Sequence, residues 1–251
     1  MSGHSKWSSI KHKKGVADAR RGQLFSKLAR AIIVAAREGG PDPDNNISLA
    51  NAIEKARESS MPKDNIERAI TRGSGAGTDG QAYEQITYEG YASGGVALLV
   101  EAVTDNRNRT AAEVRHLFAK HAGSLGASGA VAWLFERRAV VLVDGDRVDE
   151  DRLTLAAAEG DADDVEREGS SFRVTGEPEA LPTVRAALDA AGIPYESAGL
   201  TMLPKTTVSI EDEATAKKVL RLIDALEGND DVQDVYANFD IPEGVLEAAV
   251  S

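Results

Sequence analysis

The chain has 251 residues, which is enough for two or three domains. Hydrophobic residues make up 42% of it and aromatic residues only 5%, so we expect cores built on Ala, Val, Leu and Ile. Cysteine is absent, which excludes disulfides, thiolate metal ligands and cysteine nucleophiles. The formal net charge is −12, and such an acidic chain repels nucleic acid unless positive charge is gathered in one region.

No apolar run in the sequence approaches the roughly 18–20 residues that a membrane span needs. The longest such runs, Ala31–Ala36 and Val96–Val100, have the size of a single buried element. The basic N-terminus is not followed by the apolar segment of a signal peptide. These features predict a soluble, cytoplasmic protein without membrane contact.

Positive charge is concentrated at the start of the chain. Residues 2–37 carry nine Lys or Arg and one Asp, a net charge of +8. Residues 138–204 sum to −9 and residues 205–251 to −7. A polyanion would therefore approach the protein from its N-terminal side.

The first part of the chain has the apolar spacing of helices. A helix is predicted from Ala17 to the Gly39–Gly40 pair, because Leu24, Leu28 and Ile32 recur every fourth residue. A second helix should begin at a cap residue, Asn46 or Ser48, and a third should span 62–73, with Pro62 in its first turn. Residues 73–80, GSGAGTDG, are predicted to be a flexible linker.

Beyond residue 80 the pattern alternates between strands and helices. Strands are expected at 85–91, 96–104 and 130–136, with a helix at 110–122. The order β-α-β-β-α-β follows, over 139–143, 150–159, 163–168, 171–175, 178–191 and 195–202, which is the ferredoxin-like order. A strand at 206–210, a helix at 211–227 and a strand at 232–238 complete the chain.

These elements predict an α+β protein of three domains. The first, residues 1–80, is a basic arm with a small helical bundle. Segments 81–137 and 205–251 are each too small to enclose a core, so we expect them to form one discontinuous α/β domain. The acidic ferredoxin-like domain, 138–204, is inserted into it. Both α/β domains are expected to be ferredoxin-like.

The basic arm and first helix are the main candidate for nucleic-acid binding. Lys and Arg neutralise phosphates and release counterions, and an aromatic ring among cations can stack on a base. The candidate residues are Lys6, Trp7, Lys11, His12, Lys13, Lys14, Arg20, Arg21 and Lys27. The alternative is a solvated tail that keeps the protein soluble, but the acidic background favours nucleic acid.

A second cluster, TDNRNRT at 104–110, lies between a predicted strand and a predicted helix. Arg107 and Arg109, with the Thr110 hydroxyl, could bind an anion as an exposed polar group at a helix N-terminus. Equally, Asn108 could cap the helix while Asp105 pairs with an Arg, which is ordinary turn chemistry. The sequence leaves both interpretations open.

Nothing in the sequence indicates catalysis, a cofactor, a metal or a small-molecule substrate. His116 and His121 are five residues apart and do not share a helix face. The acidic run 144–151 has Val148 where a calcium loop needs a ligand, and the chain has no Gly-x-Ser-x-Gly elbow. We therefore expect a protein that is not an enzyme.

Five motifs in order resemble the YebC/PmpR family, and the likeness is densest in residues 2–140. They are SGHSKW-x-x-I-KHKK, ADARRGQLFSKLAR, MPKDNIERAI-x-RG, YEGYASGGVALLVE and TDNRNRTAAEVR. Relatives in that family include probable transcriptional regulators and a mitochondrial translational activator of cytochrome c oxidase. The resemblance implies a cytoplasmic, non-enzymatic protein of three domains, one inserted in another. One departure is Ala92-Ser93, where the family more often has Gly-Pro; we expect it to alter a turn only.

The resemblance implies two different functions. One is a DNA-binding transcriptional regulator. The other is a ribosome-associated translation factor whose arm binds ribosomal RNA and which eases stalled, proline-rich translation. The motifs are shared by both groups, and the two functions remain open at this point.

Overall fold

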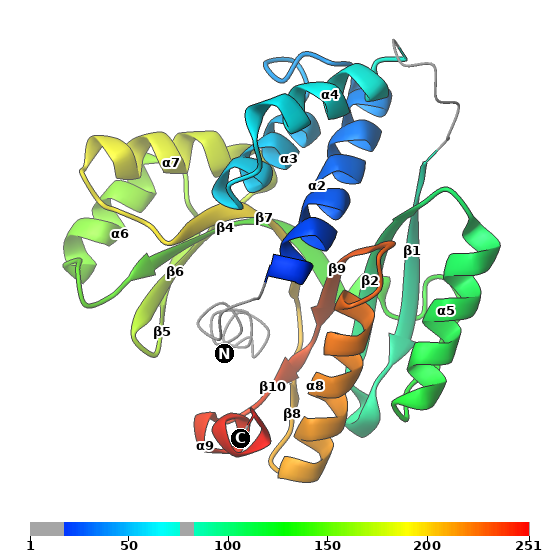
Figure 1. Cartoon of the computed structure of the whole chain (residues 1–251). Coiled ribbons are helices and arrows are strands. Elements are labelled where there is room, and N and C mark those ends of the chain that lie inside the picture. Colours follow the sequence, from blue (N-terminus) through cyan, green and yellow to red (C-terminus); the bar gives the residue numbers. More distant parts are fainter. Residues whose placement is uncertain (1–17, 76–82, 251) are drawn as a thin grey trace. The chain divides into compact units, whose positions relative to one another are not determined.

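The computed structural model describes residues 18–75 and 83–250 (Figure 1). Residues 135–203 form one compact unit, and the other described residues form a second. The mixture of helices with antiparallel sheets confirms the predicted α+β class. The helical part and its α/β neighbour fall in the same unit, so their division into two domains stays a prediction.

The helical part consists of α2 (Asp18–Gly39), α3 (Ile47–Glu58) and α4 (Lys63–Gly73), close to the predicted spans. Its core includes Ile32 of α2 and Leu49 of α3, both fully buried. Asn46 is the residue that caps α3, because its side-chain oxygen accepts the Leu49 N–H at 3.0 Å. Its amide group also donates to the Ala35 carbonyl oxygen at 2.8 Å, which ties the end of α2 to the start of α3.

Gly73 allows the end of α4 to approach α2 closely. A Cβ atom at this position would lie 2.5 Å from the carbonyl oxygen of Ile33 and 2.7 Å from the Cβ of Ala36. Such distances are far inside van der Waals contact, and both neighbours are buried residues of α2. The glycine is therefore required by packing.

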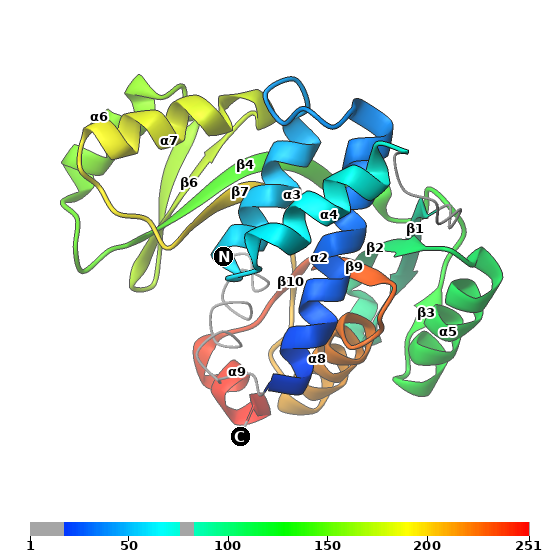
Figure 2. The same cartoon turned by 45° about the horizontal axis from the view of Figure 1, so that its top comes forward.

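A four-stranded sheet, in the order β3-β1-β2-β9, forms the α/β part of this unit (Figure 2). It contains β1 (Glu84–Tyr91), β2 (Ala97–Thr104), β3 (Ser124–Leu125) and β9 (Val232–Ala237). Helices α5 (Arg107–Lys120) and α8 (Glu213–Glu227) pack on it through a core that includes Phe118 and Leu222. A short parallel pair, β8 (Val208–Ser209) with β10 (Phe239–Asp240), and helix α9 (Glu243–Val250) complete the unit.

The predicted strand at 130–136 is wrong. Residues Ala132–Leu134 form a single 3-10 turn, and β4 (Phe135–Asp144) is one unbroken strand that begins after it. The Glu89 carboxylate accepts the backbone N–H groups of Gly129, Val131 and Ala132 at 2.6–2.7 Å. These donors are therefore not available for a strand ladder.

The unit at 135–203 has the predicted β-α-β-β-α-β order. After β4 come α6 (Glu150–Glu159), β5 (Asp164–Glu168), β6 (Ser171–Gly176), α7 (Leu181–Ala190) and β7 (Ser197–Pro204). The strands lie in the order β5-β6-β4-β7, and β6 pairs antiparallel with both of its neighbours. The core lies between this sheet and the two helices and includes Leu153, Phe172 and Leu188. The other α/β part has a different order: β1-β2-α5-β3 before the unit at 135–203, and β8-α8-β9-β10-α9 after it.

Within the described ranges, 18–75 and 83–250, no helix is long and apolar enough to cross a bilayer. The same residues contain no group of three or more His, Asp or Glu side chains placed to hold a metal ion.

Candidate nucleic-acid interface

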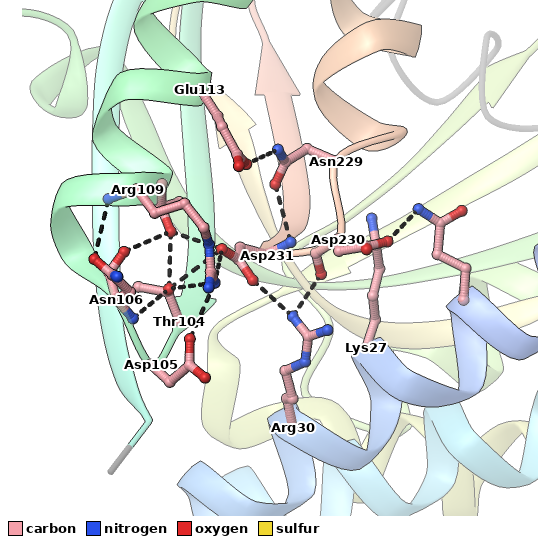
Figure 3. Close-up of polar contacts among 12 residues, drawn as sticks. Lys27, Arg30, Thr104, Asp105, Asn106, Arg109, Glu113, Asn229, Asp230 and Asp231 are labelled. Atoms are coloured by element: carbon pink, nitrogen blue, oxygen red, sulfur yellow. Dashed lines mark hydrogen bonds and ion pairs between the residues drawn. The ribbon is translucent and has the colours of Figure 1, made fainter. Parts of the chain in front are cut away.

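Three polar side chains of α2, spaced four and three residues apart, face the loop between α8 and β9 (Figure 3). Gln23 donates to the Gly228 carbonyl oxygen at 2.8 Å and to the Asp230 carboxylate at 2.6 Å. Arg30 donates to the Asp230 carbonyl oxygen at 2.8 Å. This face of α2 is therefore used to attach the helical part to the α/β part.

Lys27 is the third of these side chains, and it was predicted to bind nucleic acid. Its Nζ donates to the carbonyl oxygen of Glu227, the last residue of α8, at 2.6 Å. A cation at this position donates to a carbonyl group of the last turn of α8 and complements the negative end of the helix dipole. Burial lowers the pKa of Lys27 to about 8, although the carboxylates of Glu227 and Asp230 act to raise it.

Asp231 is the centre of the polar network (Figure 3). Only 5% of the residue is exposed. One carboxylate oxygen accepts Nη1 of Arg30 at 2.9 Å. The other accepts Nη2 of Arg109 and the Thr110 hydroxyl, each at 2.7 Å, and contacts the Thr104 hydroxyl at 3.2 Å. A single carboxylate thus joins α2, α5 and β2.

The surroundings of Asp231 favour its ionised form. Burial acts to raise the pKa of this carboxyl group, but hydrogen bonds from Arg109 and Thr110 and the charges of Arg109 and Arg30 outweigh it, and the pKa is lowered. Arg109 also pairs with Asp105 at 3.0 Å. Asp231 therefore remains charged at neutral pH.

The cluster at 104–110 was predicted to be exposed, and for its two threonines this is wrong: Thr104 and Thr110 are fully buried. The helix cap is Asn106, whose side chain accepts the Arg109 N–H at 3.1 Å, and not Asn108. The predicted pairing of Asp105 with an arginine is confirmed. Most of this cluster therefore serves the turn and the Asp231 network.

Arg107 differs from Arg109 in its exposure. Its side chain is 67% exposed and lies 3.5 Å from the Glu84 carboxylate, a loose surface pair. Nucleic-acid contact by either arginine stays a prediction, but only Arg107 has its guanidinium largely in solvent.

A cavity of about 710 Å³ lies beside this network. Arg30 and Arg109 contribute its positive charge, while Asp105, Glu113, Asp230 and Asp231 contribute carboxylates. Because acidic groups outnumber the guanidinium groups two to one, the cavity does not suit a phosphate.

The other predicted residues are placed as follows. Lys6, Trp7, Lys11, His12, Lys13 and Lys14 lie outside the described residues. Arg20 lies in the first turn of α2, and Arg21 beside it is exposed. The helical part also exposes cations on α3 and α4 that the sequence reasoning did not single out, namely Arg57, Lys63, Arg68 and Arg72. The four-residue spacing of Arg68 and Arg72 was the available signal, because it puts both on one face of α4.

These features define an α+β protein whose positive charge lies on a helical part, joined to an acidic α/β part through a buried carboxylate. Comparison with known families is consistent with this architecture. Residues 5–76 match the TACO1/YebC protein N-terminal domain, and residues 83–239 match the TACO1/YebC second and third domain. The chain belongs to the TACO1/YebC family, and the predicted family is confirmed.

Several relatives are similar over nearly their full length. A protein from Rubrobacter xylanophilus is 61% identical over 246 residues, covering 98% of both chains, and one from Halothermothrix orenii is 52% identical over 249 residues, covering 98% of both. Both are named probable transcriptional regulatory proteins. The crystal structure of a conserved hypothetical protein from Aquifex aeolicus matches with a TM-score of 0.79 and 52% identity, covering 90% of this chain and 93% of that one.

Proposed function

We propose that this protein is a non-enzymatic regulator of gene expression that binds nucleic acid through its N-terminal basic region, with DNA as the target and transcription as the process. The observation that carries the proposal is the separation of charge: residues 2–37 hold +8 in a chain of −12. The names of the relatives, probable transcriptional regulatory proteins, support the same function.

The internal contacts of α2 divide its cations into two groups. Lys27 and Arg30 hold the α8–β9 loop, so they belong to the framework of the fold. Arg21 is exposed and lies near the N-terminal end of α2, which leads back to the lysines of the arm. The arm, Arg20 and Arg21 are therefore the residues that we assign to phosphate contact, together with Arg107.

The test is the salt dependence of binding. Wild-type protein and a Lys11→Ala/Lys13→Ala/Lys14→Ala variant are titrated into labelled duplex DNA between 50 and 200 mM salt. If each lysine neutralises one phosphate, the slope of log K against log salt should become less negative by about 0.9 per lysine, up to about 2.7. Circular dichroism checks that the variant remains folded.

The matched control removes three cations of α8 instead, in Lys217→Ala/Lys218→Ala/Arg221→Ala. It changes the net charge by the same amount and should leave most of the slope in place. Equal slopes for wild-type and arm variant would exclude the arm as the site. If the slope became less negative by the same amount in the arm variant and in the control, binding would depend on the net charge of the protein alone.

A specific observation favours a second candidate, the translation factor that binds ribosomal RNA. Two aromatic side chains of the α/β part, Trp133 and Tyr91, are exposed, with 66% and 37% of each residue accessible. Aromatic rings stack on unpaired bases, which structured RNA offers in its loops. Sedimentation of lysate at low and high salt separates the two functions: salt-sensitive migration with ribosomal particles supports the second, and residence in the soluble fraction with promoter binding supports the first.

A further inference from the structure

The loop that connects β3 to β4 is held rigidly by one side chain. Glu89 is 6% exposed, and its carboxylate accepts the backbone N–H groups of Gly129, Val131 and Ala132. Its own carbonyl oxygen accepts the N–H of Gly126 at 2.7 Å. Burial acts to raise the pKa of Glu89, but these three N–H groups outweigh it and lower the pKa, so the carboxylate remains ionised at neutral pH.

Two exposed aromatic rings, Trp133 of this loop and Tyr91 at the end of β1, are tied to the same loop atom. The Tyr91 hydroxyl donates to the Ala130 carbonyl oxygen at 3.1 Å, and the Trp133 indole N–H donates to the same oxygen at 3.2 Å. Both polar groups are thus satisfied within the chain. What the pair offers to a partner is ring surface, and the shared acceptor limits how far either ring can turn.

The loop residues ahead of Trp133 are small. Gly126, Ala127, Ser128 and Gly129 are all exposed, and this stretch of the loop carries no bulky side chain. The backbone N–H of Lys205 donates to the carbonyl oxygen of Leu134, the residue after Trp133, at 2.8 Å. Lys205 is exposed, and this bond holds its backbone next to the residue that follows Trp133.

The size of the patch identifies the kind of partner. With about 250 Å² for a whole aromatic side chain, the exposed parts of Trp133 and Tyr91 together offer on the order of 250 Å². A stable protein–protein interface needs about 800 Å² on each side. Stacking of a base needs one ring face and a nearby cation for the adjoining phosphate. The exposed ring of Trp133 can serve as the first, and the exposed Lys205, whose backbone bonds to the residue after Trp133, is the candidate for the second.

We infer that Trp133, supported by Tyr91, stacks on an unpaired nucleobase of a single-stranded nucleic acid and that Lys205 contacts the adjoining phosphate. The inference rests on the proposed nucleic-acid binding and adds to it a second contact, on the α/β part, that recognises bases. Glu89 acts as a positioning residue, because it sets the conformation of the loop without reaching the base.

The experiment uses the full chain with Trp7→Phe, which leaves Trp133 as the sole tryptophan of the two in the sequence. A labelled single-stranded DNA of about 15 nucleotides is compared with an abasic strand of equal length and with the duplex. We expect the single strand to quench Trp133 fluorescence. Adding Trp133→Ala should weaken binding of the single strand by about five- to a hundredfold, the loss of one stacked base, and leave binding of the abasic strand unchanged.

Three further variants identify the contribution of each part. Trp133→Phe keeps a ring and should restore most of the affinity. Glu89→Gln should weaken binding of the single strand but not of the abasic strand, because it loosens the loop and leaves the cations in place. Leu155→Ala, which removes a side chain of similar exposure (65% for the residue) in the other unit, should have no effect.

The outcomes separate this inference from the proposed function. If the single strand does not quench Trp133 and Trp133→Ala does not weaken its binding, while the duplex still binds, the inference is overturned and the proposed function stands. Failure of every oligonucleotide to bind overturns both. A fluorescence change with an apolar peptide, and none with the oligonucleotide, would assign the rings to a protein partner and overturn the inference.

Discussion

Replacing Asp231 by Asn should destabilise the fold considerably, although the two side chains have nearly the same shape. The carboxylate accepts from Arg30, Arg109, Thr104 and Thr110. An amide offers one acceptor oxygen and turns an NH₂ group toward donors at the other position. The substitution therefore removes a charge from two arginines and also places donor against donor.

The size of this destabilisation depends on how well water and other groups can solvate the two arginines once the Asp231 charge is removed. Removing one member of a buried ion pair costs about 3–5 kcal/mol. The Arg109 side chain is 43% exposed and keeps Asp105, while the Arg30 side chain is only 18% exposed and keeps the Asp230 carbonyl oxygen. These remaining contacts place the expected loss of unfolding free energy near the lower limit, about 3 kcal/mol.

Urea unfolding followed by tryptophan fluorescence measures this loss, because Trp133 lies in the same unit as Asp231. With a slope of about 2 kcal/mol per M, the midpoint should fall by about 1.5 M. The control is Asp230→Asn, one residue away, where the side chain is exposed and accepts from Gln23. It should change stability by about 0.5 kcal/mol or less.

The pH dependence provides a second criterion. Because the pKa of Asp231 is lowered in the folded state, its stabilisation is fully present above the unfolded value of 3.8 and is lost as pH falls through the folded value. The difference between wild-type and Asp231→Asn should thus stay constant from pH 7 to about 5 and shrink below about 4. A difference no larger than that of Asp230→Asn, or one that persists unchanged at pH 3, would refute the role assigned to this carboxylate.

Two further predictions concern the attachment of the helices. Gly73→Ala should lower the free energy of unfolding by about 1–3 kcal/mol, because its Cβ would overlap Ile33 and Ala36. Gly22→Ala, whose Cβ would have nothing within 4 Å, should raise it by up to about 1 kcal/mol. Thermal unfolding of the two variants should therefore show opposite shifts. The stability of wild-type relative to Lys27→Met should rise between pH 8 and 10.5, because the pKa of Lys27 is about 8 when folded and 10.5 when unfolded, so that the unfolded state holds more protons there. Urea midpoints at pH 7.5, 9 and 10.5 would test this, and a parallel course for the two proteins would contradict it.

Local sequence patterns were sufficient for most of the long elements. The helix predicted at 150–159 has these same limits in α6, and the predicted helix at 211–227 differs from α8 by two residues. An Asp caps each of them, and α8 has a strong apolar period. Such signals act within one or two turns, so the sequence alone contains them.

The errors occur where a distant residue determines the local structure. The apolar run at 130–136 reads as a strand, but Glu89, some 40 positions earlier, takes up its N–H groups. Strand β3 has two residues and exists only through pairing with Gly90 and Tyr91. Helix α9 was missed because it has only eight residues, and Pro242 directly before it is not one of the residue types that signal a helix cap. None of these features has a local signature.

The Asp231 network could not be predicted from the sequence, for a related reason. One aspartate among 41 acidic residues carries no distinguishing pattern, and its four partners come from positions 30 to 110. The cluster at 104–110 was noticed, yet its exposure could not be judged without knowing that residue 231 lies over it. Lys27 was likewise taken for a surface cation, because the end of α8 is 200 positions away.

The exposed cations of the helical part and the cations that hold the α8–β9 loop should respond differently to salt. This difference determines how the salt dependence of binding is interpreted. Exposed charges such as Arg21 are screened over roughly 8 Å at physiological ionic strength, so their contacts with phosphate weaken steeply as salt rises. The pair between Arg30 and Asp231 is screened much less, because only 18% and 6% of the two side chains are exposed. A salt concentration that releases nucleic acid should therefore leave α2 attached to the α/β part. The slope of log K against log salt should therefore report the phosphate contacts of the exposed cations and not a rearrangement of the fold. Under this condition the arm variant and its control can be compared.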